Sequence, residues 1–508
     1  MGVLNFVGLV AFGYLIVDRL HRLVKRYLKF RALKAVPGPE CSFLLGQFPR
    51  IRAEPFFAPH KGWWKDIVGY DAPLMRYSGL LGTNMLVILD TDLIREILMA
   101  PAGKDDCRFF KPTIFFLPAL IPQGLVTLEG KEWLKHRRLV QPSFSVSYLK
   151  EALDECVPPK VERFVKLWLQ AGEKQEIDVI SHLAALTLDV IGDVGFSCDC
   201  NGLKDLEQWV VEAQQKSGTD EIASPKLSDP LISSLEEFTR PDLGRVILAL
   251  CGLNDLDQYV NPKTIRLVKA LNSRVDGIIA AARSLDFDNK NNDTSKQTTK
   301  SLIQVLMNTK DSDPSSSGDG IGRNSNNNAP LSDSELRDEL KTFLLAGHET
   351  TSTWCHWALF ALSKFPDVQE KLYQNVLKEA PSLDSANSRI TLEHVEQMDY
   401  LHCFLQECLR LYPPVGLTLR LNRYEETFAG YKIPPQTNLV IPMHLIHRHP
   451  KHWSDPETFR PERWSSPSDS APSGLDTKGF TFLPFGAGGK PLKTRCFCFS
   501  GFLQDSHS

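Results

Sequence analysis

The sequence lacks several features that would point to common protein classes. Its formal net charge is only −3 at pH 7, which is too small to argue for binding to nucleic acid. It contains no internal repeat, and its 42% hydrophobic and 23% charged residues are ordinary for a globular protein. At 508 residues the chain is long enough for one large domain or two modest ones.

The eleven cysteines also lack a recognisable framework. Cys198/Cys200 and Cys496/Cys498 are pairs separated by one residue, whereas redox and zinc sites of the C-x-x-C type have two. The pattern favours reduced cysteines in a cytosolic body. Only the second pair lies among glycines and basic residues, FGAGGKPLKTRCFCFSG, and this stretch suggests a loop that holds an anionic, metal-bearing cofactor.

Long apolar runs are scarce, but one lies at Val3–Val17. It is followed by seven basic residues and one acidic residue between positions 18 and 34. A full span needs about 20 apolar residues, so this run spans a membrane only if Leu20 and Leu23 extend it while their basic neighbours snorkel. Because basic residues stay on the cytosolic side, we predict a membrane anchor at residues 1–36. A surface-lying amphipathic helix or a targeting peptide is the alternative.

The remaining residues, 37–508, are predicted to form a single domain that is mainly α with a minor β-sheet part. Apolar spacing is mostly helical from Lys131 to about Ala282. Two stretches poor in apolar residues, Ser284–Lys300 and residues 311–330, predict solvated loops, and the second is expected to be disordered. Strand-like pieces occur at Met85–Leu89, Tyr431–Ile433 and Leu439–Ile441.

A capping box formed by Ser332 and Glu335 predicts the start of a long helix that runs to about Lys364. Its middle reads Ala346-Gly347-His348-Glu349-Thr350-Thr351. A glycine in a helix interior costs about 1 kcal/mol relative to alanine, and threonines can hydrogen-bond the carbonyl one turn back and distort the helix. The stretch therefore indicates either a kinked core helix or a groove for a small ligand, with an acid and a hydroxyl available to relay protons.

This motif resembles the oxygen-activation motif of the haem-thiolate monooxygenases, the cytochrome P450 superfamily. Three more stretches are similar to elements of the family and occur in the expected order: Trp133-x-x-x-Arg137, Glu407-x-x-Arg410 and the FRPERW stretch that contains Arg463. The resemblance runs from the N-terminus to about Lys490. It implies the cytochrome P450 fold, an α+β arrangement with a long central helix over the haem, here with the C-terminal segment missing.

The resemblance also implies roles for individual residues. Thr350 would hydrogen-bond dioxygen and Glu349 would deliver protons from solvent. Trp133, Arg137 and, by position, Arg420 would contact the haem propionates. The structural triad behind the haem would consist of Glu407, Arg410 and Arg463.

Cofactors and partners follow from the same resemblance. It implies haem b, O2 as co-substrate and a small apolar organic substrate. Electrons would come from an NADPH-dependent reductase or a ferredoxin-type donor, since the sequence has no flavin or nicotinamide motif. The expected location is the endoplasmic reticulum membrane, with the catalytic domain facing the cytosol. Thr113–Leu125 and Val415–Leu421, which are expected to line the pocket, are apolar and fit fatty acids, terpenoids, sterols or carotenoids equally.

The thiolate loop departs from the family pattern, Phe-Gly-x-Gly-x-Arg-x-Cys-x-Gly. Phe485, Gly486 and Gly488 fit this pattern, and Lys490 replaces the arginine while keeping its charge. The cysteine position then falls on Leu492, which cannot ligate iron.

Three explanations for this departure compete. The favoured one is that residues 491–508 are an atypical tail of a truncated or mis-spliced product. Alternatively, the loop is lengthened and Cys496, or in second place Cys498, is the iron ligand; the four extra residues span up to about 14 Å when extended. The third is an inactive, haem-poor relative that serves as a binding or regulatory protein.

Overall fold

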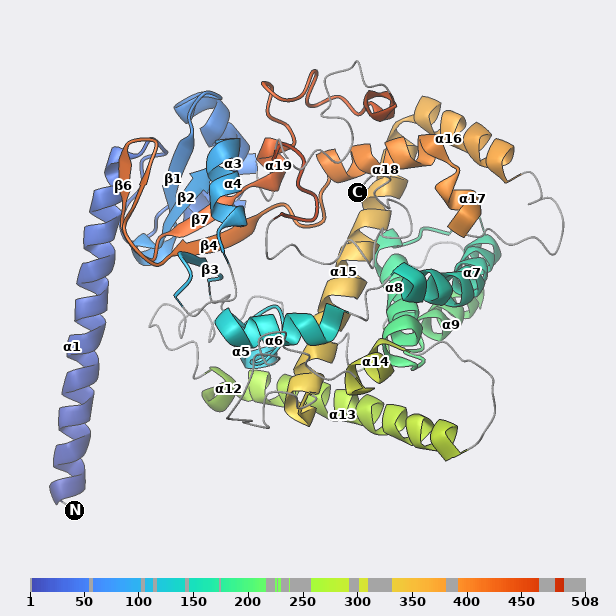
Figure 1. Cartoon of the computed structure of the whole chain (residues 1–508), viewed down its shortest axis with the longest axis horizontal. Helices are drawn as coiled ribbons and strands as arrows, with labels where there is room; N and C mark the ends of the chain where they lie inside the picture. The colour runs from blue at the N-terminus through green and yellow to red at the C-terminus, as the bar shows by residue number, and fades with distance from the viewer. Residues whose placement is uncertain are drawn as a thin grey trace, which may run out of the picture.

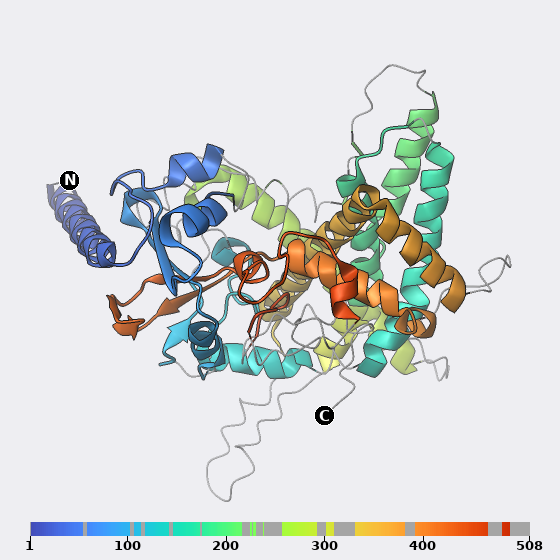
Figure 2. The ribbon, with the colours of Figure 1, turned by 90° about the horizontal axis from the view of Figure 1, so that it is seen from above.

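The protein places a helical body beside a smaller part built around a β-sheet, and the first helix stands along the outer edge of the sheet part (Figures 1 and 2). The computed structural model describes residues 2–53, 58–101, 106–112, 117–141, 146–172, 175–215, 224–225, 227–229, 237, 257–291, 301–308, 331–380, 392–465 and 480–487. Residues 311–330 and 491–508, predicted as a disordered loop and an atypical tail, lie outside these ranges. The division into an anchor and one domain stays a prediction.

The described helices account for most of the regular structure. They are α1 (Gly2–Ala32), α2 (Phe48–Ala53), α3 (Ala58–Gly62), α4 (Thr91–Met99), α5 (Leu117–Leu120), α6 (Gly130–Val140), α7 (Val146–Ala171), α8 (Val179–Phe196), α9 (Gly202–Gln215), α12 (Asp257–Val260), α13 (Pro262–Asn291), α14 (Leu302–Asn308), α15 (Asp333–Lys364), α16 (Pro366–Glu379), α17 (Leu392–Glu396), α18 (Asp399–Leu411) and α19 (Met443–Ile446).

The described strands form a five-stranded sheet and a separate hairpin. They are β1 (Leu74–Ser78), β2 (Asn84–Ile88), β3 (Phe109–Phe110), β4 (Thr418–Asn422), β5 (Glu426–Phe428), β6 (Tyr431–Ile433) and β7 (Asn438–Ile441). The five-stranded sheet has the order β1-β2-β7-β4-β3, in which only the β2–β7 pair is parallel. Strands β5 and β6 pair with each other. The fold is therefore mainly α with a minor β-sheet part, as predicted.

The first part of the loop expected at Ser284–Lys300 is wrong, and residues 292–300 lie outside the described residues. The sequence predicts that helical structure ends near Ala282, but α13 continues through Ser284 to Asn291. No glycine or proline occurs between Ser284 and Asn291 to stop it. Low apolar content alone therefore did not mark the helix end, because a solvent-facing helix can be polar.

Helix α15 runs through the middle of the helical body and packs against α8, α13 and α18 (Figures 1 and 2). The largest apolar cluster of the described residues lies around it and includes Leu188 and Ile191 of α8, Leu271 of α13 and Leu340 and Leu344 of α15 itself. Helix α8 is the described helix that is apolar and long enough to cross a membrane, but 67% of it is buried within the fold. It is thus a core helix that supports α15.

Candidate functional site

The long helix begins and ends where the sequence predicts. Ser332 is its N-cap: its hydroxyl accepts a hydrogen bond from the Glu335 N–H (3.3 Å), and its own N–H donates to Glu335 Oε2 (2.7 Å). The helix ends at Lys364, and the next helix, α16, begins two residues later with Pro366. Because this box satisfies N–H groups that have no partner inside the helix, it fixes where α15 begins.

The motif in the middle of α15 is held from one side by α8. Thr187 of α8 donates its hydroxyl to the carbonyl of His348 (3.3 Å). Burial lowers the pKa of His348 to about 4, so its imidazole is neutral at physiological pH. This histidine lies on the α8 side of the helix, whereas the carboxylate of Glu349 is exposed.

Thr350 makes the hydrogen bond expected of a threonine inside a helix. Its hydroxyl donates to the carbonyl of Ala346, one turn back, over 2.6 Å. Helical structure is nevertheless continuous from Asp333 to Lys364, so the motif does not break the helix. The buried Gly347 precedes Thr350 by three residues and therefore lies on the same face of α15.

The structure brings Glu407, Arg410 and Arg463 together in a fully buried cluster. Arg410 donates Nε and Nη2 to the two oxygens of Glu407 over 2.9 and 2.8 Å, and Arg463 donates Nε to Glu407 Oε1 over 3.0 Å. Exposure is 0% for Glu407 and Arg410 and 2% for Arg463. Glu407 and Arg410 are therefore not a solvated ion pair on the surface of a helix, although their spacing is also common there.

The triad is linked to the start of the glycine-rich loop through His447. Its carbonyl accepts a hydrogen bond from Arg410 Nη1 (2.9 Å), and its ring Nε2 accepts one from the Leu483 N–H (2.8 Å). Burial lowers the pKa of His447 to about 3, so the ring stays neutral and can accept. Sequence reasoning gave this residue no role; the only signal was the HRHP stretch that contains it.

The glycine-rich loop starts in an apolar cluster shared with α15. Phe482 packs in a cluster with Trp354 of α15, and Phe485 lies at the edge of that cluster. Gly486 has φ +74°, a left-handed conformation that favours glycine, and its N–H donates to the Leu483 carbonyl (3.0 Å). Residues beyond Ala487, including Lys490, Leu492, Cys496 and Cys498, lie outside the described residues.

Trp133 and Arg137 lie one turn apart on α6 and contact each other. Trp133 is 5% exposed, and the Arg137 guanidinium lies 5.1 Å from the centre of its ring. Burial lowers the pKa of Arg137. Although the stretch is rich in basic residues, the face of α6 with Trp133 and Arg137 is therefore not simply an exposed basic surface.

Arg420 on β4 is a buried cation close to the start of α6. Burial lowers its pKa, and the carboxylate of Glu129, the N-cap residue of α6, acts in the opposite direction. Among the residues that the structure describes, its guanidinium donates to Thr418 Oγ1 (3.3 Å) and Leu419 O (2.8 Å), both uncharged, and forms no ion pair. Since a buried charge is costly unless it is paired, this environment fits an anionic ligand group such as a propionate.

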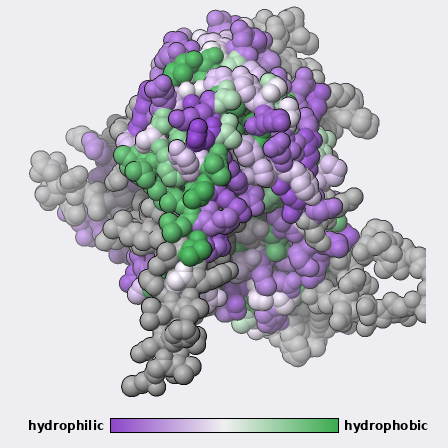
Figure 3. Space-filling view, turned by 90° about the vertical axis from the view of Figure 1, so that its left-hand side faces the viewer, coloured by the Kyte–Doolittle hydropathy of each residue, from purple (hydrophilic) through white to green (hydrophobic). Residues whose placement is uncertain are grey.

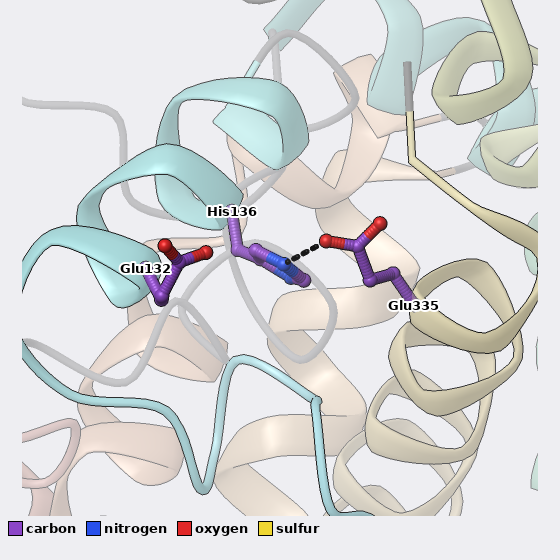
Figure 4. A group of neighbouring side chains, drawn as sticks. All are labelled: Glu132, His136 and Glu335. Atoms are coloured by element: carbon purple, nitrogen blue, oxygen red, sulfur yellow. Dashed lines mark hydrogen bonds and ion pairs between the residues drawn. The ribbon is translucent and has the colours of Figure 1, made fainter. Parts of the chain in front are cut away.

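Helix α6 is joined to α15 by a buried histidine. His136 contacts Glu339 Oε1 through Nδ1 (2.7 Å) and Glu335 Oε1 through Nε2 (3.3 Å). Figure 4 shows Glu132 on the other side of the ring, and the ligand atoms of Glu132, His136 and Glu335 lie within 4.8 Å of one another. Because Lys135 Nζ already lies 3.0 Å from Glu335 Oε1, we interpret the group as an ion-pair cluster that holds α6 in place.

The cluster should make stability depend on pH. Burial alone would lower the pKa of His136, but the hydrogen bond and charge of Glu339, helped by Glu335, raise it overall. A histidine with a raised pKa in the folded state stabilises the fold fully below its unfolded pKa of about 6.5, and this contribution is lost as pH rises through the folded value. The free energy of unfolding from urea titrations should thus fall above about pH 6.5. In His136→Gln this fall should be smaller; an unchanged pH profile would contradict the assignment.

The comparisons with known proteins agree with this site. The family model described as Cytochrome P450 matches residues 74–490. Human "Cytochrome P450 4Z1" is 27% identical over 93% of this chain and 83% of its own length. Mouse "Cytochrome P450 3A41" is 26% identical (92% and 82%), and rice "Cytochrome P450 734A6" is 27% identical (90% and 80%).

A mainly helical protein with a long central helix, a buried Glu–Arg–Arg triad and a glycine-rich loop beside that helix matches this family over most of its length. The chain therefore belongs to the cytochrome P450 family. By family it is a haem-dependent monooxygenase, and the family implies haem iron and O2. These relatives give no support to the alternative of an inactive binding protein.

Proposed function

We propose that this chain inserts one oxygen atom of O2 into a small apolar organic substrate, with haem b as its cofactor. The observation that carries the proposal is the face of α15 that bears Gly347 and Thr350. Trp354 follows Thr350 by one helical turn on the same side of α15. The apolar cluster around Trp354 includes Phe485, at the start of the glycine-rich loop. The acid–alcohol motif and the loop therefore lie beside each other.

The residues that would hold the propionates are Trp133, Arg137 and Arg420, with Lys490 as a further cation in the loop. Support comes from the buried guanidinium of Arg420, whose hydrogen bonds go to uncharged oxygens. The thiolate that would hold the iron is that of Cys496 or Cys498. When bound, a thiolate-ligated haem supplies the electron density that favours cleavage of the O–O bond.

The chain's own contribution would be to move protons and to keep the site rigid. Thr350 donates its hydroxyl hydrogen bond to the Ala346 carbonyl, and the lone pairs of a hydroxyl oxygen can accept a hydrogen bond at the same time. Glu349 is exposed, so solvent can reach it. We assign Glu349 to proton uptake from solvent and Thr350 to proton delivery in the pocket.

Removing the Thr350 hydroxyl tests this assignment. Thr350→Val keeps the side-chain shape but removes the hydroxyl, so product formation should fall by about 100-fold, the usual contribution of a positioned proton donor. The assay is product formed per haem with a reductase and an apolar test substrate. Thr342→Val is a matched control, because Thr342 makes the same bond to the carbonyl one turn back (2.8 Å to Asp338) two turns earlier on α15. Equal losses in both variants would contradict a proton-relay role.

Substrate and electron donor are proposed at the level of chemical class. Leu417 and Leu419, in the stretch expected to line the pocket, pack against the apolar cluster around β1 and β2. These two side chains belong to that core, so the proposal of an apolar substrate rests on the apolar composition of the two stretches expected to line the pocket, with which fatty acids, terpenoids, sterols and carotenoids are all compatible. Electrons would come from an NADPH-dependent reductase or a ferredoxin-type donor.

We also propose that α1 attaches the protein to the endoplasmic reticulum membrane with the catalytic domain in the cytosol. The helix is continuous over 31 residues, from Gly2 to Ala32. The second half of α1 carries exposed apolar side chains, and the segment that follows α1 carries more of them (Figure 3). These are Val17, Leu20, Leu23, Val24, Tyr27 and Leu28 of α1, with Leu44, Leu45 and Phe48. Large apolar patches of this kind are typical of membrane-contacting surfaces.

A further inference from the structure

Two cysteines outside the haem site lie close enough to react with each other. The sulfur atoms of Cys198 and Cys200, in the turn between α8 and α9, are 3.8 Å apart. This proximity could not be predicted from the spacing, which is not that of a C-x-x-C motif. The proximity comes from the way the turn is built.

The C-terminal end of α8 folds the first cysteine back onto the helix. The N–H of Ser197 donates to the Asp193 carbonyl (3.2 Å), and the N–H of Cys198 donates to the Gly192 carbonyl (3.0 Å). Ser197 has φ +50°, so its 5→1 bond to Asp193 is the αL capping motif, and the Cys198–Gly192 bond extends it by one residue. The motif fixes the backbone of Cys198.

Gly192 makes room for both cysteines. A Cβ atom at this position would lie 2.6 Å from the Cys198 carbonyl oxygen and 2.9 Å from the Cys200 sulfur. Contacts below 3.0 Å would force the turn to shift. Because Gly192 has no side chain, the turn can pack against α8 with the sulfur atoms of Cys198 and Cys200 close to each other.

The other end of the turn is fixed by a buried carboxylate. Asp189 of α8 accepts hydrogen bonds from the N–H groups of Gly202 and Leu203 at the start of α9, both over 2.8 Å. Its exposure is 3%. With both ends held by α8, the two thiols are confined to a short segment and cannot move apart freely.

The two thiols differ in exposure and acidity. Cys198 is partly exposed, and its pKa is lowered by the hydrogen bond from Cys200 and by the nearby charge of Arg274. Cys200 is fully buried, and its pKa is raised by the interaction with Cys198 and by burial. Reactive cysteines are typically the exposed ones with a lowered pKa. Cys198 thus has the properties of an attacking thiol and Cys200 those of a resolving thiol.

We propose that Cys198 and Cys200 form a redox-modification site that hydrogen peroxide converts to a reversible disulfide. The Cys198 thiolate attacks one peroxide oxygen, the O–O bond breaks, and the leaving hydroxide takes up a proton to form water. The thiol of Cys200 then attacks the sulfur of the sulfenic acid, the S–O bond breaks, and the leaving hydroxide takes the Cys200 proton to form a second water. Two thiols lose two electrons, and one peroxide is reduced to two waters.

The test uses the purified full-length protein with one equivalent of hydrogen peroxide. Free thiols are then alkylated under denaturing conditions and the peptides are analysed by mass spectrometry. We expect the peptide with both cysteines to lose two hydrogen atoms, to carry no alkyl group, and to recover both thiols with dithiothreitol. Cys403 and Cys408 on α18 are internal controls: burial raises both pKa values, so they should react at least about tenfold more slowly.

Variants separate the two roles. Cys200→Ser should leave a sulfenic acid on Cys198 that dimedone traps, whereas Cys198→Ser should leave Cys200 unmodified because it is buried. Gly192→Ala should slow disulfide formation by moving the turn. Full alkylation of Cys198 and Cys200 in the unaltered protein after peroxide treatment would overturn the proposal. Oxidation of Cys198 and Cys200 no faster than that of Cys403 would also overturn it. Both outcomes are measured on the unaltered protein, so they do not depend on whether a variant folds.

Discussion

Replacing Glu407 with glutamine should lower the free energy of unfolding by about 3–5 kcal/mol, the usual cost of breaking a buried ion pair by removing one partner. The carboxylate of Glu407 accepts hydrogen bonds from Arg410, Arg463, the Trp464 indole (3.0 Å) and the Arg460 N–H (2.9 Å). Without its negative charge, two guanidinium groups with no more than 2% exposure stay buried and unbalanced. Such a loss is a large fraction of the stability of an ordinary domain, about 5–15 kcal/mol.

Urea unfolding followed by circular dichroism measures this loss. Glu462→Gln is a matched control: Glu462 is the residue before Arg463, but its side chain is 41% exposed and pairs with an exposed lysine, Lys371. Exposed pairs contribute little, so this variant should unfold at nearly the same urea concentration as the unaltered protein. Similar losses in both variants would show that burial of the triad is not what stabilises it.

The second large effect is expected at the position where the family has its thiolate. A variant with Leu492→Cys, Cys496→Ala and Cys498→Ala places a single thiol at the family spacing after Phe485 and Gly486. Reduced protein exposed to carbon monoxide should then show the red-shifted Soret band of thiolate-ligated haem. The same protein with Leu492→Ser should lack it, because a hydroxyl is not a thiolate ligand.

The proposed function requires the same band in the unaltered chain. Cys496→Ala should remove it and Cys498→Ala should leave it, since Cys496 is closer to the family position. The opposite pattern would assign the ligand to Cys498. Absence of the band from the unaltered chain, together with its presence in the Leu492→Cys variant, would show a pocket built for haem but no natural thiolate.

Much of the architecture could be predicted from local pattern. The capping box set the start of α15, Pro366 followed its end, and β6 and β7 fall at Tyr431–Ile433 and Asn438–Ile441, where short apolar strands were expected. These features depend on neighbouring residues, so the sequence contains the information directly. The loop expected at Ser284 failed because low apolar content does not by itself stop a helix, and no glycine or proline interrupts the sequence between Ser284 and Asn291.

The parts of the site that sequence could not provide depend on residues far apart in the chain. Glu-x-x-Arg spacing predicts a pair on one helix face, but Glu407 is fully buried and also bonds Arg463, 56 residues later, which helical spacing does not reveal. The role of His447 depends on the Leu483 N–H, and that of Gly192 on where Cys198 and Cys200 fold back. None of these contacts follows from helical or strand periodicity.

The parallel pairing of β2 with β7 has a consequence for how the protein reaches its folded state. Asn84 and Asn438, joined by a hydrogen bond of 3.0 Å, are 354 residues apart in the chain. At about 5–20 residues per second, a ribosome makes β7 roughly 20–70 s after β2. During that interval β2 has β1 on one side and an unpaired edge on the other. For most of its synthesis the new chain therefore exposes a strand edge that can pair with another chain. We expect binding by a chaperone to reduce aggregation most during this interval.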